Sequence, residues 1–132
     1  MKRYMLDTNT VSHLFRRHPG VAKRVQTAPV ASLCISAITE GELRFGLAKR
    51  LEAKGLHLAV AEFLRHVDVL AWDSAIAQRY GTMRAALERQ GKPLAPIDLL
   101  IAAHAQGANS VLVTNDSAFR QVSGLKTEDW TI

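Results

Sequence analysis

The stretch Val111-Leu112-Val113-Thr114-Asn115-Asp116 places three consecutive apolar residues directly before a polar turn that ends in an acid. A short run that is apolar at every position is typical of a strand inside a parallel sheet, where both faces are covered. Met5-Leu6-Asp7-Thr8-Asn9 repeats the pattern near the start of the chain. Because sites in such sheets form at the carboxyl ends of the strands, we expect Asp7 and Asp116 to share one rim.

The rest of the chain alternates between predicted strands and predicted helices. Strands are expected at 2–6, 33–35, 69–72 and 111–113, with helices between them and a short helix around Phe119. Parallel neighbours need crossover connections of about a dozen residues or more, usually helical. The pattern therefore predicts an α/β fold with a mostly parallel sheet covered on both faces. The length of 132 residues predicts a single domain, 1–132.

Capping residues and apolar spacing locate the helices. Ser36 is placed to cap one helix, Asp73 or Ser74 the next long one, and Pro96-Ile97-Asp98 opens a third. The expected buried sides carry Ile38, Leu43, Phe45 and Leu47 after Ser36, and Leu58, Ala61, Phe63, Leu64 and Val67 in the following helix. The end of the chain, with Leu125 and Trp130, is only weakly patterned.

Composition narrows the class of protein and of partner. Seventeen Lys and Arg against twelve Asp and Glu give a net charge of +5, which favours a polyanionic partner such as nucleic acid. The opening residues lack the apolar run of a signal peptide, and no segment approaches about 18 uninterrupted apolar residues. We therefore expect a cytoplasmic protein without a membrane span. The lone Cys34 is expected to be a small buried hydrophobe.

Four acids could converge at the rim of the sheet. Asp7 and Asp116 follow strands, whereas Glu42 and Asp98 lie near the beginnings of helices that start at the same rim. Asp98 and Asp116 could instead be helix caps, and Glu42 a solvated residue. Asp7, at the end of an apolar strand, faces desolvation and requires a cation, a proton or several donors as compensation. Together the four acids would repel one another without a cation, and an all-oxygen ligand set selects hard ions such as Mg²⁺ or Mn²⁺. We therefore expect a metal-binding and catalytic site here.

Two further groups of residues are candidates for supporting roles. Polar neighbours that could orient the carboxylates or bound waters, or could equally act as caps, are Thr8, Asn9, Ser36, Thr114 and Asn115. Basic residues that could contact RNA phosphates, or could equally form a solvated basic surface, are Arg16, Arg17, Arg44, Lys49 and Arg50.

Four motifs, in their order and spacing, resemble the PIN-domain ribonucleases. They are Met5-Leu6-Asp7-Thr8-Asn9, Ile35-Ser36 with Glu42-Leu43, Ile97-Asp98 with Ile101-Ala102-Ala103, and Val113-Thr114-Asn115-Asp116 with Phe119. Within that family the chain resembles, over nearly its whole length, VapC-type toxins of bacterial toxin-antitoxin pairs. The resemblance implies a three-layer α/β/α PIN-like fold, a homodimer, a divalent metal and a VapB-type antitoxin that forms hetero-oligomers with the toxin.

The resemblance also implies roles for the acids. Asp7, Glu42 and Asp98 match the three acids found most regularly in the family, and Asp116 matches a fourth, more variable one. They would hold one or two Mg²⁺ ions for hydrolysis of RNA, leaving 5′-phosphate and 3′-hydroxyl ends. Similarity is greatest to toxins that cut transfer RNA, one branch of which acts on the anticodon region of initiator tRNA.

Two other functions remain open from the sequence. A phosphatase of the haloacid dehalogenase type also begins with an acid after its first strand, although that family has a second Asp where Asn9 stands here. A module that binds RNA or a protein partner through its basic surface, without catalysis, is the other alternative. Mg²⁺ binding and RNA cleavage measured on the same sample would distinguish these from a ribonuclease.

Overall fold

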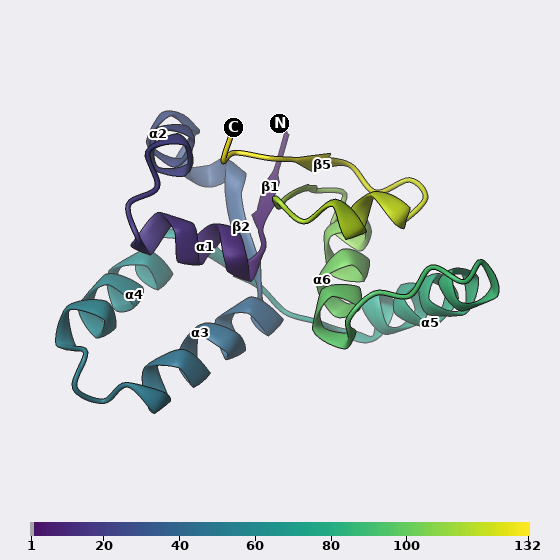
Figure 1. Cartoon of the computed structure of the whole chain (residues 1–132), viewed down its shortest axis with the longest axis horizontal. Coiled ribbons are helices and arrows are strands. Elements are labelled where there is room, and N and C mark those ends of the chain that lie inside the picture. The colour runs from purple at the N-terminus through teal and green to yellow at the C-terminus, as the bar shows by residue number, and fades with distance from the viewer. Residues whose placement is uncertain (1) are drawn as a thin grey trace.

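The computed structural model describes residues 2–132, and in this part of the chain helices alternate with short strands (Figure 1). The elements in chain order are β1 (Tyr4–Leu6), α1 (Thr8–Phe15), α2 (Pro19–Thr27), a 3-10 turn η1 (Val30–Ser32), β2 (Leu33–Ser36), α3 (Ala37–Lys49), α4 (Lys54–His66), β3 (Asp68–Leu70), α5 (Ser74–Arg89), α6 (Pro96–Gly107), β4 (Val111–Val113), a 3-10 turn η2 (Ser117–Gln121) and β5 (Thr127–Glu128).

The strands form one sheet in the order β3-β2-β1-β4-β5, and every neighbouring pair is parallel. β1 is central: Tyr4 pairs with Leu33 of β2 on one side and with Val111 of β4 on the other. The chain proceeds from β1 to β2 in one direction and later places β4 on the opposite side of β1. A crevice for ligands forms at such a reversal, beyond the carboxyl ends of the two strands.

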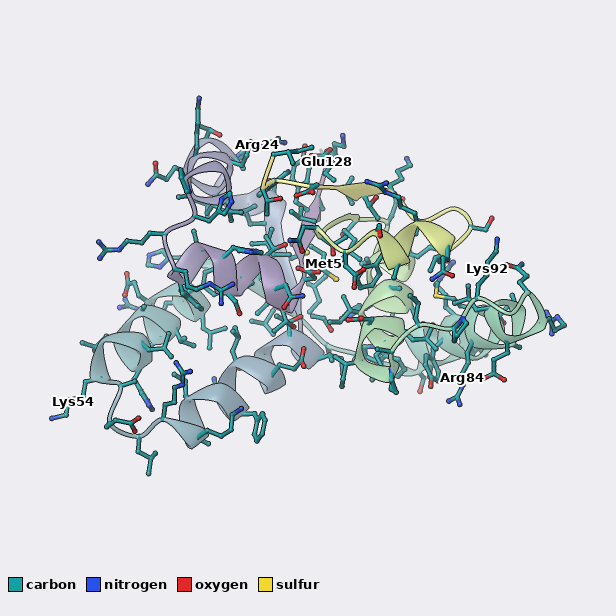
Figure 2. All side chains as sticks on the ribbon, viewed as in Figure 1. Met5, Arg24, Lys54, Arg84, Lys92 and Glu128 are labelled. Atoms are coloured by element: carbon teal, nitrogen blue, oxygen red, sulfur yellow. The ribbon has the colours of Figure 1, made fainter. Side chains whose placement is uncertain are left out.

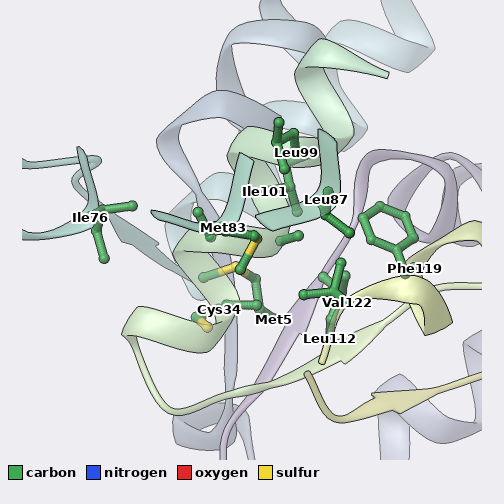
Figure 3. Close-up of a cluster of buried hydrophobic side chains, with 13 residues drawn as sticks. Met5, Cys34, Ile76, Met83, Leu87, Leu99, Ile101, Leu112, Phe119 and Val122 are labelled. Carbon is green, nitrogen blue, oxygen red and sulfur yellow. The ribbon is translucent and has the colours of Figure 1, made fainter. Parts of the chain in front are cut away.

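Successive strand residues point to opposite faces of the sheet, so each strand supplies two separate cores. Met5, Cys34 and Leu112 pack with α5, α6 and η2 in one core, where Figure 3 shows Met83, Leu87 and Phe119 around them. The other core contains Leu6, Ile35 and Val113 with the apolar residues Val11, Val21, Leu43 and Val60 of α1 to α4. Helices therefore cover both faces (Figure 1), which confirms the predicted three-layer α/β/α arrangement.

The predicted helix starts are confirmed by their hydrogen bonds. Ser36 caps α3 by accepting from the Ile38 amide at 3.1 Å, and Asp73 rather than Ser74 caps α5 by accepting from Ile76 at 3.1 Å. Asp98 lies in the first turn of α6. The thiol of Cys34 is buried, as expected.

Three apolar side chains that were expected to be buried are exposed. Phe45 is 63% exposed and Leu58 is 73% exposed, and Ala61 is exposed as well. The first two each stand two residues away from the apolar positions that do pack, such as Leu43 in α3 and Val60 in α4. Two residues turn an α-helix by about 200°, so Phe45 and Leu58 point away from the core that their neighbours enter.

The end of the chain is more ordered than its pattern indicated. β5 pairs with β4, and Trp130 is only 2% exposed. Glu128 accepts from Trp130 Nε1 at 3.0 Å and forms ion pairs with Lys2 and Arg24, the latter labelled beside it in Figure 2. Within residues 2–132 no helix combines the length and apolar character that crossing a membrane requires.

Candidate active site

Asp7 occupies the junction between β1 and α1, next to the reversal in the sheet. It is 4% exposed, and its Oδ1 accepts from the Thr10 amide at 2.8 Å, which makes it the N-cap of α1. The Asp7 amide and the Thr10 hydroxyl both donate to the Val113 carbonyl, at 3.1 and 2.9 Å. The end of β4 therefore fixes the turn that carries Asp7.

Glu42 reaches the same region from α3. Its Oε1 accepts from the Thr8 hydroxyl at 2.5 Å, and Thr8 is the residue directly after Asp7. The Thr8 hydroxyl also lies 3.4 Å from that of Thr39, which is fully buried on α3. Thr8 thus joins the start of α1 to the face of α3 that carries Glu42.

Asp98 and Asp116 complete the group from the other side of β1. Asp98 is partly buried in the first turn of α6. Asp116 caps η2, where its Oδ1 accepts from the Ala118 amide at 2.9 Å. The capping role weighed for Asp116 is therefore confirmed, whereas the cap that Asp7 provides was not predicted. Capping does not exclude a second role, because a carboxylate has several acceptor positions.

Burial and neighbouring negative charge both act on two of the four acids, Asp7 and Asp98. Burial raises the pKa of Asp7 above its usual range, hydrogen bonds from Thr114 and Thr10 oppose that rise, and the Asp116 charge adds to it. Burial likewise raises the pKa of Asp98, and the charges of Asp116, Asp7 and Glu42 raise it further. We call these four acids, Asp7, Glu42, Asp98 and Asp116, the acidic rim.

Basic side chains do not neutralise the acidic rim. None of the ion pairs within residues 2–132 includes Asp7, Glu42, Asp98 or Asp116. A buried carboxylate without a cationic partner is costly, and an oxygen-only donor set suits a hard divalent cation. In the same range no three His, Cys, Asp or Glu side chains stand close enough to form a ready-made metal site. Coordination would require side-chain rotation, which the partly exposed Glu42, Asp98 and Asp116 can make.

The polar neighbours named from the sequence differ in their positions. Thr8 and Thr114 lie against the acids, since Thr8 binds Glu42 and Thr114 lowers the pKa of Asp7. Ser36 is buried at the start of α3, where it contacts His104 rather than an acid. Asn9 and Asn115 are both exposed, on α1 and on the loop after β4.

Four of the five predicted RNA-contacting residues lie at the far ends of helices that carry the acidic rim, whereas Arg44 is two residues after Glu42. Arg16 and Arg17 follow the last residue of α1, and Lys49 and Arg50 stand at the end of α3. Arg44 pairs with Glu40 at 2.8 Å, and the Lys49 ammonium stands 4.4 Å from the centre of the Phe45 ring. Binding of RNA phosphates by these five residues therefore stays a prediction.

Sequence reasoning missed two residues that hold the site together. Thr10 anchors the Asp7 turn to β4, and its position three residues after a capping acid is a signal that could have indicated this. His104 lies in the apolar run Ile101-Ala102-Ala103-His104-Ala105 and is 2% exposed. A polar residue inside such a run needs a buried partner, which only the folded structure identifies as Ser36.

Comparison with known proteins shows the family. The PIN domain model matches residues 4–125. The chain is 38% identical to the tRNA(fMet)-specific endonuclease VapC of Shigella flexneri, across 99% of this chain and all of that protein. It is 36% identical to Ribonuclease VapC2 of Haemophilus influenzae, across 98% and 99% of the two chains.

A solved structure gives the same result. The DNA-bound VapBC complex from Salmonella typhimurium contains a chain that matches with a TM-score of 0.91 and 36% identity, across 98% of this chain and 99% of that one. Sequence and fold therefore agree over almost the whole length. The chain belongs to the PIN-domain family and, within it, to the VapC-type ribonuclease toxins of toxin-antitoxin systems.

Proposed function

We propose that this ribonuclease cuts RNA at the acidic rim with the help of Mg²⁺, for which Mn²⁺ can substitute. The observation that carries the proposal is geometric: Asp7 lies buried at the end of β1, and Glu42 of α3 accepts a hydrogen bond from Thr8, the next residue, with neither acid in an ion pair among residues 2–132. Burial raises the pKa of Asp98, and the charges of Asp116, Asp7 and Glu42 raise it further. Family membership favours RNA hydrolysis over the phosphatase and the non-catalytic binding module. Asp7, Glu42 and Asp98 form the main ligand group, and Asp116 is the fourth member.

The chain's own residues have distinct parts in this reaction. Asp7 is rigid, because its cap to Thr10 and the bonds to the Val113 carbonyl fix its position. Glu42 is held by Thr8, and Asp98 is presented by the first turn of α6. When bound, a divalent cation supplies charge neutralisation at the scissile phosphate and activation of a water. The carboxylates orient that assembly, so no nucleophilic side chain is required.

The substrate we propose is transfer RNA, with the anticodon region of initiator tRNA as the specific site. Two relatives that are 38% identical carry the name tRNA(fMet)-specific endonuclease. The net charge of +5 supports a polyanionic substrate. Arg16, Arg17, Arg44, Lys49 and Arg50 are the proposed phosphate contacts.

We also propose a cytoplasmic complex of this toxin, as a homodimer, with a VapB-type antitoxin. The supporting observation is that similar chains were solved as VapBC complexes from Salmonella typhimurium and Rickettsia felis. Co-expression with the candidate antitoxin and measurement of the mass of the purified complex would test this. A toxin that stays monomeric and unbound would contradict it.

The decisive experiment for the reaction uses purified protein and a panel of RNAs. We expect cleavage of initiator tRNA with Mg²⁺, none with excess EDTA, and recovery on addition of Mg²⁺ or Mn²⁺. Sequencing of the fragments should place the cut in the anticodon region and find 5′-phosphate and 3′-hydroxyl ends. Cleavage that continues in EDTA would refute metal dependence, and equal cutting of elongator tRNAs would refute the substrate.

A further inference from the structure

A buried histidine outside the acidic rim connects α3 and α6, two helices that carry residues of the rim. His104 Nδ1 lies 2.7 Å from the hydroxyl of Ser36, and these side chains are 2% and 0% exposed. Ser36 is the N-cap of α3 and His104 belongs to α6, so the contact spans residues 68 positions apart in the chain. No role in RNA hydrolysis assigned above uses this pair.

Two polar contacts meet at the Ser36 hydroxyl. The Ile38 amide donates to Ser36 Oγ at 3.1 Å, and His104 Nδ1 lies 2.7 Å from the same oxygen. A hydroxyl has two acceptor positions and one hydrogen, so Ser36 can accept from the amide and also exchange a hydrogen bond with either tautomer of the imidazole. Burial lowers the pKa of His104, although the Asp73 charge and the Ala71 backbone oppose that effect. Both buried side chains therefore have a hydrogen-bond partner.

The first turn of α3 combines one apolar contact with several polar ones. Ile38 is partly buried against the core that α6 enters, and only Thr39 and Leu43 of α3 are buried outright. From α1, Thr8 contacts Thr39 and Glu42, and from α6, His104 contacts Ser36. The beginning of α3 is therefore held between two helices by hydrogen bonds, which constrain direction more sharply than apolar packing does.

The geometry links this contact to the acidic rim. Glu42 comes six residues after Ser36 along α3, and His104 comes six residues after Asp98 along α6. Six residues of helix span about 9 Å, so a small rotation at the contact would shift both carboxylates. We propose that His104, acting through Ser36, is a positioning residue that fixes α3 against α6 and so sets Glu42 relative to Asp98. The proposal rests on the acidic rim being the metal site put forward above.

The test compares variants that keep or remove the contact to Ser36. His104→Asn retains a polar side-chain atom near the position of Nδ1, whereas His104→Gln places it near Nε2, and Ser36→Ala removes the hydroxyl. Val122→Ala truncates a buried residue of the same core as α6 and is the packing control. Readouts are the melting temperature, Mg²⁺ affinity by calorimetry, RNA cleavage at saturating Mg²⁺, and hydrogen exchange of the α3 amides.

We expect Ser36→Ala and His104→Gln to weaken Mg²⁺ binding by about tenfold or more, as loss of residues that orient ligands does elsewhere. Exchange should quicken at the start of α3. His104→Asn should recover most of the affinity. Ser36→Ala removes the cap to Ile38 as well as the contact to His104, so the double variant should bind Mg²⁺ as Ser36→Ala alone does. Val122→Ala should lower the melting temperature and leave Mg²⁺ affinity unchanged.

Other outcomes would overturn the proposal. If the variants have lower melting temperatures but bind Mg²⁺ as tightly as the wild type, the His104–Ser36 contact is purely structural. Unchanged hydrogen exchange of the α3 amides would show that the contact does not fix the start of α3. If His104→Gln fails to fold, Ser36→Ala decides alone, since it deletes one oxygen. A wild-type protein that binds Mg²⁺ without cutting RNA would contradict the proposed reaction and leave the positioning claim standing.

Discussion

Replacing Asp7 by asparagine should abolish catalysis while stabilising the fold. Asn and Asp are equally good N-caps, so the bond from the Thr10 amide to Oδ1 survives the substitution. The charge is lost, and with it the cost of burying a carboxylate that is 4% exposed and near Asp116. We expect a gain of about 1 kcal/mol, or about 4 °C in melting temperature for a chain of this size.

The pH dependence of stability distinguishes the effect of the Asp7 charge from that of its capping hydrogen bond. The pKa of Asp7 is raised in the folded protein, so between its unfolded and folded values the native state binds more protons. That contribution to wild-type stability is complete below the unfolded pKa and is lost as the pH rises through the folded pKa. The stability of Asp7→Asn should not fall over this pH range. Asp7→Ala also removes the cap and should be about 1 kcal/mol less stable than Asp7→Asn.

Metal titration and cleavage assays complete this test. With Mg²⁺ at ten times its dissociation constant, the wild type should gain about 1.4 kcal/mol of stability, and Asp7→Asn much less. Cleavage should fall by more than about 100-fold in both variants, beyond the loss usual for residues that only orient a ligand. A fully active Asp7→Asn protein, or one less stable than the wild type at neutral pH, would refute the assignment of Asp7.

Four further substitutions test other parts of the structure. Thr8→Val should lower kcat/KM about tenfold through the freed Glu42, with a small change in melting temperature; equal activity would contradict the role of Thr8. Leu43→Ala should lower the free energy of unfolding, measured with urea, by about 2–5 kcal/mol, and Phe45→Ala should lower it by less than about 0.5 kcal/mol. Equal losses would contradict the burial of Leu43 and the exposure of Phe45. Trp130→Ala should cost about 3–5 kcal/mol, and a silent change would show that the chain end is not anchored.

Much of the fold could be predicted because local signals and the overall structure agree. Val111 to Val113 is apolar at each position since β4 lies inside a parallel sheet, and Ser36 and Asp73 cap the helices that they precede. The convergence of Asp7 and Asp116 followed from their places after parallel strands. These are features that a residue's immediate neighbours in sequence determine.

The remaining features depend on partners that are distant in sequence. β5 is two residues long and is a strand because β4 offers it backbone hydrogen bonds, not because of its own pattern. Phe45 is apolar without being buried, so hydrophobicity alone misplaced it. The contact of His104 with Ser36 joins helices whose relative placement requires the complete sheet.

The anchoring of Asp7 by the Val113 carbonyl has a consequence for the order in which the protein matures. Thr10 and Val113 are 103 residues apart, so a ribosome has made most of the chain before the bond between them can form. β1 likewise cannot pair with β4 until β4 has been synthesised. Contacts of such long range form late and slowly in folding. We therefore expect nascent chains and fragments that end before β4 to lack an assembled rim, so that the ribonuclease becomes active only after its synthesis is nearly complete.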